Sequence, residues 1–143
     1  MNEEVAIERE PQPDPTRLML QLPYGLMGFE PIKQYALVAH PGEAPFAWLE
    51  VPDNPRLAFL VVEAGAAFPD YRPDVGSQDV EFLGLKQPED ALILTIVTLR
   101  KNLPPTANLK GPVVVNRHTR TAKQVIPTNA PELSVAQPLP VAG

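Results

Sequence analysis

Hydrophobic residues in this 143-residue chain gather into seven short runs, separated by proline, glycine or polar turn residues. The alternation is clearest where Ile93, Thr95, Val97 and Leu99 fall on one face of a strand. Short apolar or alternating runs between turn residues indicate β-strands rather than helices. We therefore predict strands at residues 17–22, 34–39, 46–51, 57–63, 91–99, 111–116 and 122–127.

One short helix is expected near residue 77. Ser77 is suited to cap its N-terminus, and Asp79 places a negative charge in the first turn, where helices favour it. Gly84 is suited to end the helix in the left-handed conformation. A second short helical turn is expected at residues 88–90.

These elements predict a mainly β fold, namely a small, antiparallel, barrel-like single domain with one or two short helices. The 19 prolines argue against long helices, because proline disrupts helix interiors. Closure into a barrel would remove exposed strand edges, although the pattern alone does not separate a barrel from a sandwich. We expect a flexible acidic N-terminal arm (1–16), the barrel domain (17–128) and an extended, Pro-rich C-terminal tail (129–143).

Composition excludes several classes of protein. The chain has no cysteine, so it forms no disulfide and offers no thiolate to a metal. No apolar run approaches the roughly 20 residues that a membrane-spanning helix needs. The acidic N-terminus lacks the basic and apolar regions of a signal peptide. We expect a cytoplasmic protein without a membrane partner.

The sequence holds no recognisable catalytic pattern. His40 and His118 lie far apart in predicted turns, where each is expected to face solvent, and neither belongs to a cluster with metal-ligand spacing. No nucleophile elbow and no phosphate-binding glycine loop occurs. We therefore expect no catalytic residue, no metal site and no cofactor, and a protein that binds other molecules without being an enzyme.

Charge is distributed unevenly around a net value of −5. Residues 1–40 carry −3, residues 41–94 carry −7, and residues 95–143 carry +5. This asymmetry is compatible with an acidic face that meets a basic partner. It also fits strands and loops that merely differ in their solvent-facing charges.

A small β-barrel that binds oligonucleotides is the alternative function. Basic residues of the C-terminal half could contact phosphates. However, the net charge is negative, and none of the nine aromatic residues lies after Phe82. The basic stretch therefore lacks the stacking rings that single-stranded nucleic acids use, and we expect no direct nucleic-acid partner.

A protein partner fits the sequence better, and "AFPDYRPDV" (residues 67–75) is the most suggestive segment. Asp70 and Asp74 flank Tyr71 in a loop that prolines stiffen, and a preordered loop loses little entropy on binding. Tyrosine is also common in interface hot spots. We select Asp70, Tyr71 and Asp74 as candidate partner-binding residues. The alternative is that Phe68 and Tyr71 fold back over the core.

The segment "TANLKGPVVVN" (residues 106–116) joins a polar turn to a buried strand. Thr106 is suited to cap local amides, and Asn108 tolerates unusual backbone angles. Leu109 and the valines are expected to lock the turn to the core. We add Asn108 to the candidate partner-binding residues, with a purely structural role as the alternative.

Several segments together resemble the flagellar assembly factor FliW family. They occur in the family's order: "LPYGLMGFE", "FAWLEVPDNPRLAFLVVE", "FPDYRPDV", "LGLKQPEDALILTIVTL", "TANLKGPVVVN" and "AKQVI". The resemblance covers residues 18–127, and its specificity lies in the agreement of separate motifs in order and spacing. Two departures stand out. Met27 occupies a position where relatives commonly have proline, and the tail "PELSVAQPLPVAG" keeps little of the usual ending.

The resemblance implies a monomeric, cytoplasmic, non-enzymatic protein with two alternative partners. One partner is flagellin, the filament subunit. The other is CsrA, a dimeric RNA-binding protein that represses translation of flagellin mRNA. Proteins of this family bind unsecreted flagellin, and after export the freed factor binds CsrA and relieves the repression.

Overall fold

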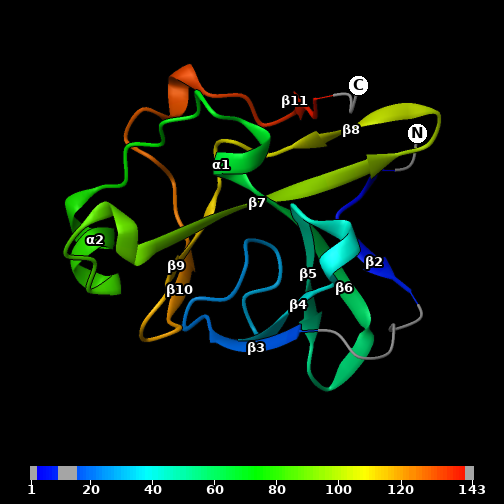
Figure 1. Ribbon diagram of the computed structural model, residues 1–143, viewed down its shortest axis with the longest axis horizontal. Coiled ribbons are helices and arrows are strands. Elements are labelled where there is room, and N and C mark those ends of the chain that lie inside the picture. Colours follow the sequence, from blue (N-terminus) through cyan, green and yellow to red (C-terminus); the bar gives the residue numbers. More distant parts are fainter. Residues whose placement is uncertain (1–2, 10–15, 141–143) are drawn as a thin grey trace.

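A computed structural model describes residues 3–9 and 16–140 of the chain. Within them, eleven strands form one curved sheet, and the helices are few and short (Figure 1). The strands are β1 (Glu3–Glu4), β2 (Ala6–Glu8), β3 (Thr16–Gln21), β4 (Gln34–Ala39), β5 (Phe46–Val51), β6 (Asn54–Glu63), β7 (Ala91–Arg100), β8 (Leu103–Ala107), β9 (Val113–Asn116), β10 (Ala122–Gln124) and β11 (Gln137–Pro138). The helices are α1 (Ala64–Ala67) and α2 (Ser77–Leu83), with 3-10 turns η1 (Pro41–Glu43), η2 (Pro88–Asp90) and η3 (Ala130–Glu132).

The sheet curls into an incompletely closed barrel. Its main path runs β10-β9-β7-β6-β5-β4-β3, and neighbouring strands are antiparallel. The two end strands approach each other at a single parallel bridge between Gln21 and Thr121, where the Gln21 backbone N–H donates to the Arg120 carbonyl at 2.9 Å. The predicted fold class, a mainly antiparallel, barrel-like domain with two short helices, is therefore confirmed.

Alternation of side chains places one face of each central strand in the main core. Phe59 and Val61 of β6 are fully buried and pair in register with Leu49 of β5 and Ile96 of β7. The loop between β3 and β4, drawn in blue near the centre of Figure 1, packs against the barrel. Its residue Leu26 is only 1% exposed and belongs to the main core.

Part of the arm expected at residues 1–16 forms strands, namely β1 and β2, whereas residues 1–2 and 10–15 lie outside the described residues. β6 and β7 pair with each other only around Val61 and Ile96 and then diverge. β2 pairs with β6 on one side of this gap, and β1 pairs with β7 on the other. Ile7 is 8% exposed and joins the core. Local sequence did not indicate these strands, because the splayed edges that receive them form only in the folded sheet.

A buried carboxylate holds this N-terminal segment to the barrel. Glu50 of β5 is 1% exposed, and it accepts hydrogen bonds from Arg9, which follows β2, and from Arg17 of β3 at 2.8 Å. The Arg9 guanidinium also lies 4.6 Å from the ring centroid of Trp48. Buried charges are stable in proteins when they are paired in this way.

The C-terminal segment docks along β8, a strand that the sequence pattern did not reveal. β8 contains Pro104 and Pro105, which lack the N–H that a ladder requires, so its composition reads as a turn. It nevertheless pairs with β7 on one side and with β11 on the other. The Leu139 N–H donates to the Pro105 carbonyl at 3.2 Å, so the tail expected to be extended at residues 129–143 is held by backbone bonds within its described part.

The predicted helix near residue 77 forms, with one correction at its start. Gly76 is the N-cap, and Ser77 is the first helical residue and makes no capping hydrogen bond through its side chain. Gly84 ends the helix with φ 69°, the left-handed conformation predicted for it. Leu83 of α2 packs with Val114 and Val125 in a second, smaller core on the outer face of β9 and β10.

Strands β9 and β10 form an antiparallel hairpin, and Asn116 holds its turn in place. Its side-chain Oδ1 accepts from the N–H groups of His118 at 2.8 Å and Thr119 at 3.2 Å. Its Nδ2 donates to the Leu83 carbonyl at 2.7 Å, which ties the hairpin to α2. Arg120 takes the positive φ of 66° that the turn needs.

Candidate partner-binding site

The structure brings most of the predicted partner-binding residues together. Asp70 and Tyr71 line a pocket of about 500 Å³. The pocket is bounded by Ala67, Phe68, Pro69, Asp70, Tyr71, Arg72, Leu109, Asn129 and Leu133. Asn108 precedes the lining residue Leu109, whereas Asp74 lies further along the loop and does not line the pocket. The site therefore joins the loop after α1 to the turn after β8.

Tyr71 is both part of the pocket and part of the fold. Its hydroxyl donates to the Leu109 carbonyl at 2.7 Å, and its side chain is half-buried. Burial raises the pKa of Tyr71 to about 12, because the phenolate form would lose its hydration. The hydroxyl is thus hydrogen-bonded within the fold, to the turn after β8. The aromatic ring is the part of Tyr71 that could contact a partner.

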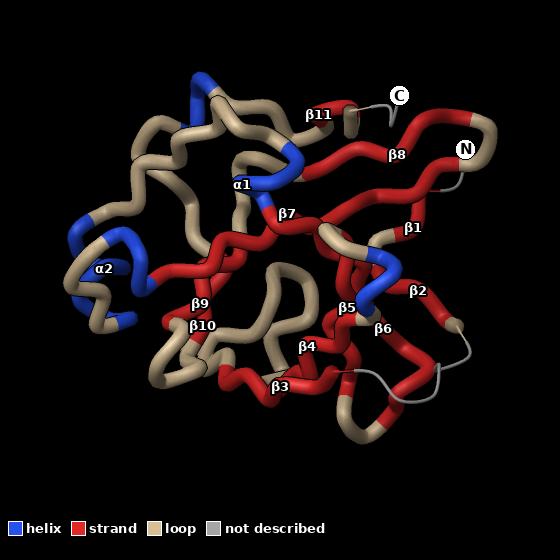
Figure 2. The backbone as a smooth tube through the Cα atoms, viewed as in Figure 1, coloured by secondary structure: helices blue, strands red, loops and turns tan. Residues whose placement is uncertain are grey.

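The loop of residues 68–75 is clamped by a segment 55 residues later in the chain. The side chain of Asn129 accepts from the Asp74 N–H at 2.8 Å and donates to the Arg72 carbonyl at 3.0 Å. Thr128 donates from its hydroxyl to the Asp74 carboxylate at 2.9 Å. The two segments run side by side, as Figure 2 shows. Asp74 therefore has a structural partner, and the loop is fixed by more than its prolines.

Asp70 differs from Asp74 in its surroundings. Its side chain is exposed, and it makes no ion pair with any described residue. The neighbouring Arg72 instead donates to the carbonyls of Pro69 at 2.7 Å and Tyr71 at 3.0 Å. Asp70 thus presents a negative charge on a loop whose backbone is held in place.

Asn108 shapes the turn after β8. Its Oδ1 accepts from the Lys110 N–H at 3.0 Å, and its own N–H donates to the Ile96 carbonyl at 3.0 Å. Two details differ from expectation. In the described residues, positive φ occurs outside glycine at Asn102 and Arg120 but not at Asn108, and Thr106 is a buried residue of β8 rather than a cap of the turn.

Sequence reasoning missed an aromatic cluster beside Lys123. The Tyr24 and Phe82 rings lie 5.2 Å apart, and the Lys123 ammonium lies 5.0 Å and 5.8 Å from their centroids. Lys123 also forms an ion pair of 2.5 Å with Asp79. The absence of aromatic residues after Phe82 was thus misleading, because the fold carries rings from earlier segments to a basic residue of β10.

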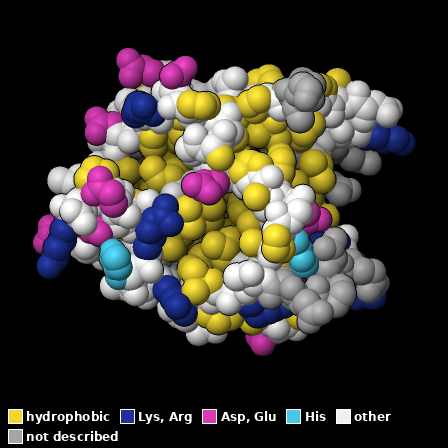
Figure 3. Space-filling model, in the orientation of Figure 1, with side chains coloured by type: hydrophobic (Ala, Val, Ile, Leu, Met, Phe, Trp, Pro, Cys, Tyr) yellow, Lys and Arg dark blue, Asp and Glu magenta, His cyan; other side chains and the backbone are white. Residues whose placement is uncertain are grey.

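Apolar side chains are common on the surface of this protein. Figure 3 shows them gathered across the centre of one face, with charged side chains mostly around them. Among the described residues, the exposed large hydrophobic ones are Met19, Tyr24, Met27, Phe82, Leu103, Ile126 and Val135. Contiguous apolar surface of this kind is typical of proteins that bind other molecules.

His118 is more constrained than a solvated turn residue. Its Nε2 lies 3.0 Å from Oδ1 of Asp90, although its side chain is 70% exposed. Asp90 also accepts from the Lys86 N–H at 3.0 Å. The Lys86 hydrogen bond, aided by His118, lowers the pKa of the Asp90 carboxyl against the effect of burial. The pair joins η2 to the β9–β10 hairpin, and no group of three potential ligands in the described chain could hold a metal.

Most of the chain is similar to one protein family. A family model described as FliW protein matches residues 7–139. The flagellar assembly factor FliW of Leptospira biflexa serovar Patoc is 34% identical over 113 residues, which cover 78% of this chain and 74% of the relative. The factor of the same name from Natranaerobius thermophilus is 36% identical over 110 residues, which cover 76% of this chain and 73% of the relative.

A solved structure agrees with this similarity. A crystal structure of the flagellar assembly factor FliW superposes with a TM-score of 0.72 at 30% identity, and the match covers 84% of each chain. The relatives are named as assembly factors and not as enzymes. None of the helices in the described residues is long and apolar enough to span a bilayer.

Proposed function

This chain belongs to the FliW family of flagellar assembly factors, and we propose that it binds flagellin and, when free, binds and antagonises the translational repressor CsrA. By sequestering CsrA it would release flagellin mRNA for translation. It would do so in the cytoplasm, as a monomer when free, without catalysis and without a cofactor. The observation that carries this proposal is the family match across nearly the whole domain.

The loop of residues 68–75 supports a role in partner recognition. Asp70 is exposed and has no basic partner in the described chain, so it can attract a basic surface such as that of an RNA-binding protein. Tyr71 lines the pocket, Asn108 precedes its lining residue Leu109, and Asp74 fixes the loop through Thr128. We propose Asp70 and Tyr71 as contacting residues, with Asn108 and Asp74 beside them.

The proposal is tested by competition on RNA. Labelled flagellin mRNA leader bound to CsrA should be released when the purified chain is added, and prior addition of flagellin should prevent the release. RNA that stays on CsrA at a large excess of the chain would contradict the antagonist function.

The aromatic cluster beside Lys123 favours a second candidate, an oligonucleotide-binding barrel. Tyr24 and Phe82 place aromatic rings beside the basic residue Lys123. Proteins that bind single-stranded nucleic acids stack nucleobases on rings in such surroundings. Asp79 neutralises Lys123, however, and this opposes phosphate attraction. Titration of RNA into the chain without CsrA separates the two candidates. Micromolar binding with a steep salt dependence would support the second.

A further inference from the structure

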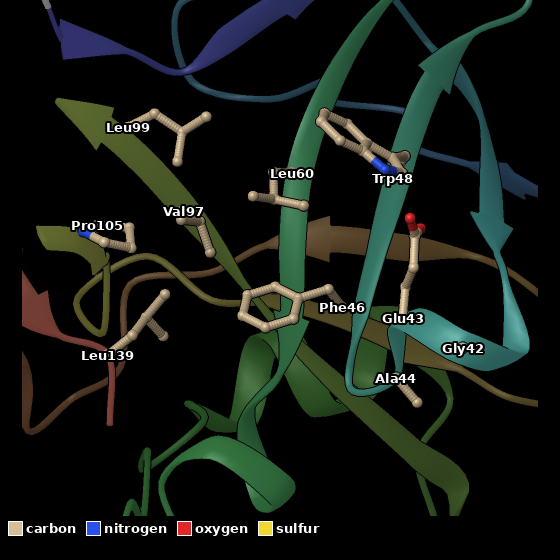
Figure 4. A pocket seen from close by; sticks show the side chains of 10 residues that line it. All are labelled: Gly42, Glu43, Ala44, Phe46, Trp48, Leu60, Val97, Leu99, Pro105 and Leu139. Carbon is tan, nitrogen blue, oxygen red and sulfur yellow. The ribbon is translucent and has the colours of Figure 1, made fainter. Parts of the chain in front are cut away.

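A second groove lies on the outer face of the sheet and shares no lining residue with the Tyr71 pocket. Its volume is about 510 Å³. Leu60 points into it from β6, opposite to its core-facing neighbours Phe59 and Val61. Figure 4 shows Phe46, Trp48, Leu60, Val97 and Leu99 across the groove, with Glu43 on one side and Pro105 and Leu139 on the other.

The groove has an apolar floor that the chain leaves partly open. Phe46, Trp48, Leu60 and Leu99 are only half-buried, although they come from three adjacent strands. Its volume lies in the range of roughly 300–1,000 Å³ that is usual for ligand pockets. Because the floor belongs to paired strands, the surface is formed before any partner arrives and little ordering would be needed on binding.

Among the lining residues the groove carries charge of one sign only, and Arg9, which lies 4.6 Å from the Trp48 ring centroid, is paired with Glu50. Glu43 is the one charged residue among the described residues that line it, and its side chain is exposed. Glu43 forms no ion pair with any described residue. On the far side, Pro105 and Leu139 add apolar surface and no charge. A cationic group placed above this floor would therefore meet an unneutralised carboxylate.

We propose that this groove binds a segment of a partner protein that carries adjacent apolar side chains and a lysine or arginine. The apolar side chains would cover Phe46, Trp48 and Leu60, and the basic group would pair with Glu43. Anionic ligands such as nucleic acids are disfavoured, since no lysine or arginine of the described part of the chain lines the groove. The inference rests on the proposed function, because it assigns one surface to a protein partner.

Trp48 makes the groove directly observable, because it is the chain's only tryptophan. The probe is a synthetic amphipathic peptide of leucine and lysine, and its control has the same leucines with glutamate in place of lysine. The leucine–lysine peptide should shift Trp48 emission to shorter wavelength in a saturable way. The leucine–glutamate peptide should bind at least tenfold more weakly.

Charge reversal locates the basic contact. Glu43→Lys should weaken the leucine–lysine peptide about fivefold at low salt, the scale of one exposed ion pair, and should strengthen the leucine–glutamate peptide. Asp53→Lys is the matched control, because Asp53 is also exposed and lies in the turn at the other end of the β5–β6 hairpin. It changes the net charge equally and should leave both affinities nearly unchanged.

Three results would overturn the inference: no saturable change in Trp48 emission, equal binding of both peptides, or equal losses in Glu43→Lys and Asp53→Lys. Flagellin and CsrA are titrated separately into the same wild-type chain. Peptide binding without binding of either protein would leave the groove standing and reject the proposed function. Binding of flagellin and CsrA without any change of Trp48 emission by the peptides would support the proposed function and reject the groove inference.

Discussion

Gly25 occupies a position that other residues fit poorly. Its φ is +66°, and an added Cβ would lie 2.6 Å from the carbonyl oxygen of Glu30. The glycine thus allows the loop between β3 and β4 to double back and bring Leu26 into the core. The glycines of "LPYGLMGFE" were recognised as turn residues from sequence, but the close approach to Glu30 became visible only in the folded loop.

Gly25→Ala should lower the free energy of unfolding by more than about 2 kcal/mol, since a left-handed alanine alone costs about 1–2 kcal/mol and the contact with Glu30 adds to it. Urea denaturation measures the change. Gly42→Ala is the control, because nothing lies within 4 Å of its added Cβ, and it should stay within about 0.5 kcal/mol of wild type. Equal effects of the two substitutions would refute this explanation.

Tyr71 has two separable parts. Tyr71→Phe removes only the hydroxyl that donates to Leu109, so it should cost about 1 kcal/mol of stability and leave partner affinity unchanged. Tyr71→Ala also removes the ring, and it should weaken binding to flagellin or CsrA by about 2 kcal/mol, the scale of an interface hot spot. Calorimetric titration of the folded variants against each partner gives both values. Wild-type affinity of Tyr71→Ala for both partners would remove this residue from the binding surface.

At the scale of elements, Glu50 joins β5 to segments on both sides of residues 10–15. Glu50→Ala should destabilise the protein by about 3 kcal/mol, because it removes the buried carboxylate that both Arg9 and Arg17 contact. Hydrogen exchange read by mass spectrometry should show residues 3–9 losing protection first, since Arg9 follows β2 directly. Glu43→Ala is the control at an exposed site, and it should change neither the stability of the protein nor the protection of residues 3–9. Unchanged protection of residues 3–9 in Glu50→Ala would count against this anchoring role.

Asp90 links η2 to the β9–β10 hairpin and makes this link pH-dependent. Its folded pKa lies below the ordinary value of 3.8, so the deprotonated form stabilises the fold above that value. This stabilisation should be lost as the pH falls from about 4 through the folded pKa. Urea midpoints measured from pH 7 down to pH 2.5 should therefore fall less steeply for Asp90→Asn than for wild type. Parallel curves would show that Asp90 does not contribute to acid sensitivity.

The sequence pattern predicted those strands and helices that depend mainly on residues close together in the chain. The strand around Phe59 follows from its nearly continuous apolar run, the strand around Ile96 from alternation, and the helix that ends at Gly84 from a suitable end signal. β1, β2, β8 and β11 did not, because their pairing depends on edges supplied by distant strands. The clamp from Asn129 onto the loop of residues 68–75 was missed for the same reason.

Across the whole molecule, part of the charge asymmetry is neutralised within the fold. Glu50, Asp79 and Asp90 of the acidic middle segment pair with basic groups from other segments. Glu43 and Asp70 stay exposed, and neither has a basic partner among the described residues. An acidic surface for a basic partner stays a prediction from the sequence, and the fold shows that Glu43 and Asp70 are among the acids left unpaired for it.

Titration calorimetry of CsrA into the purified chain, alone and saturated with flagellin, tests the proposed function most directly. We predict saturable binding of CsrA to the free chain and at least tenfold weaker binding to the flagellin complex, because under the proposed function the chain binds CsrA only after flagellin leaves. Absence of heat with both partners, or CsrA binding that flagellin does not change, would contradict the proposal.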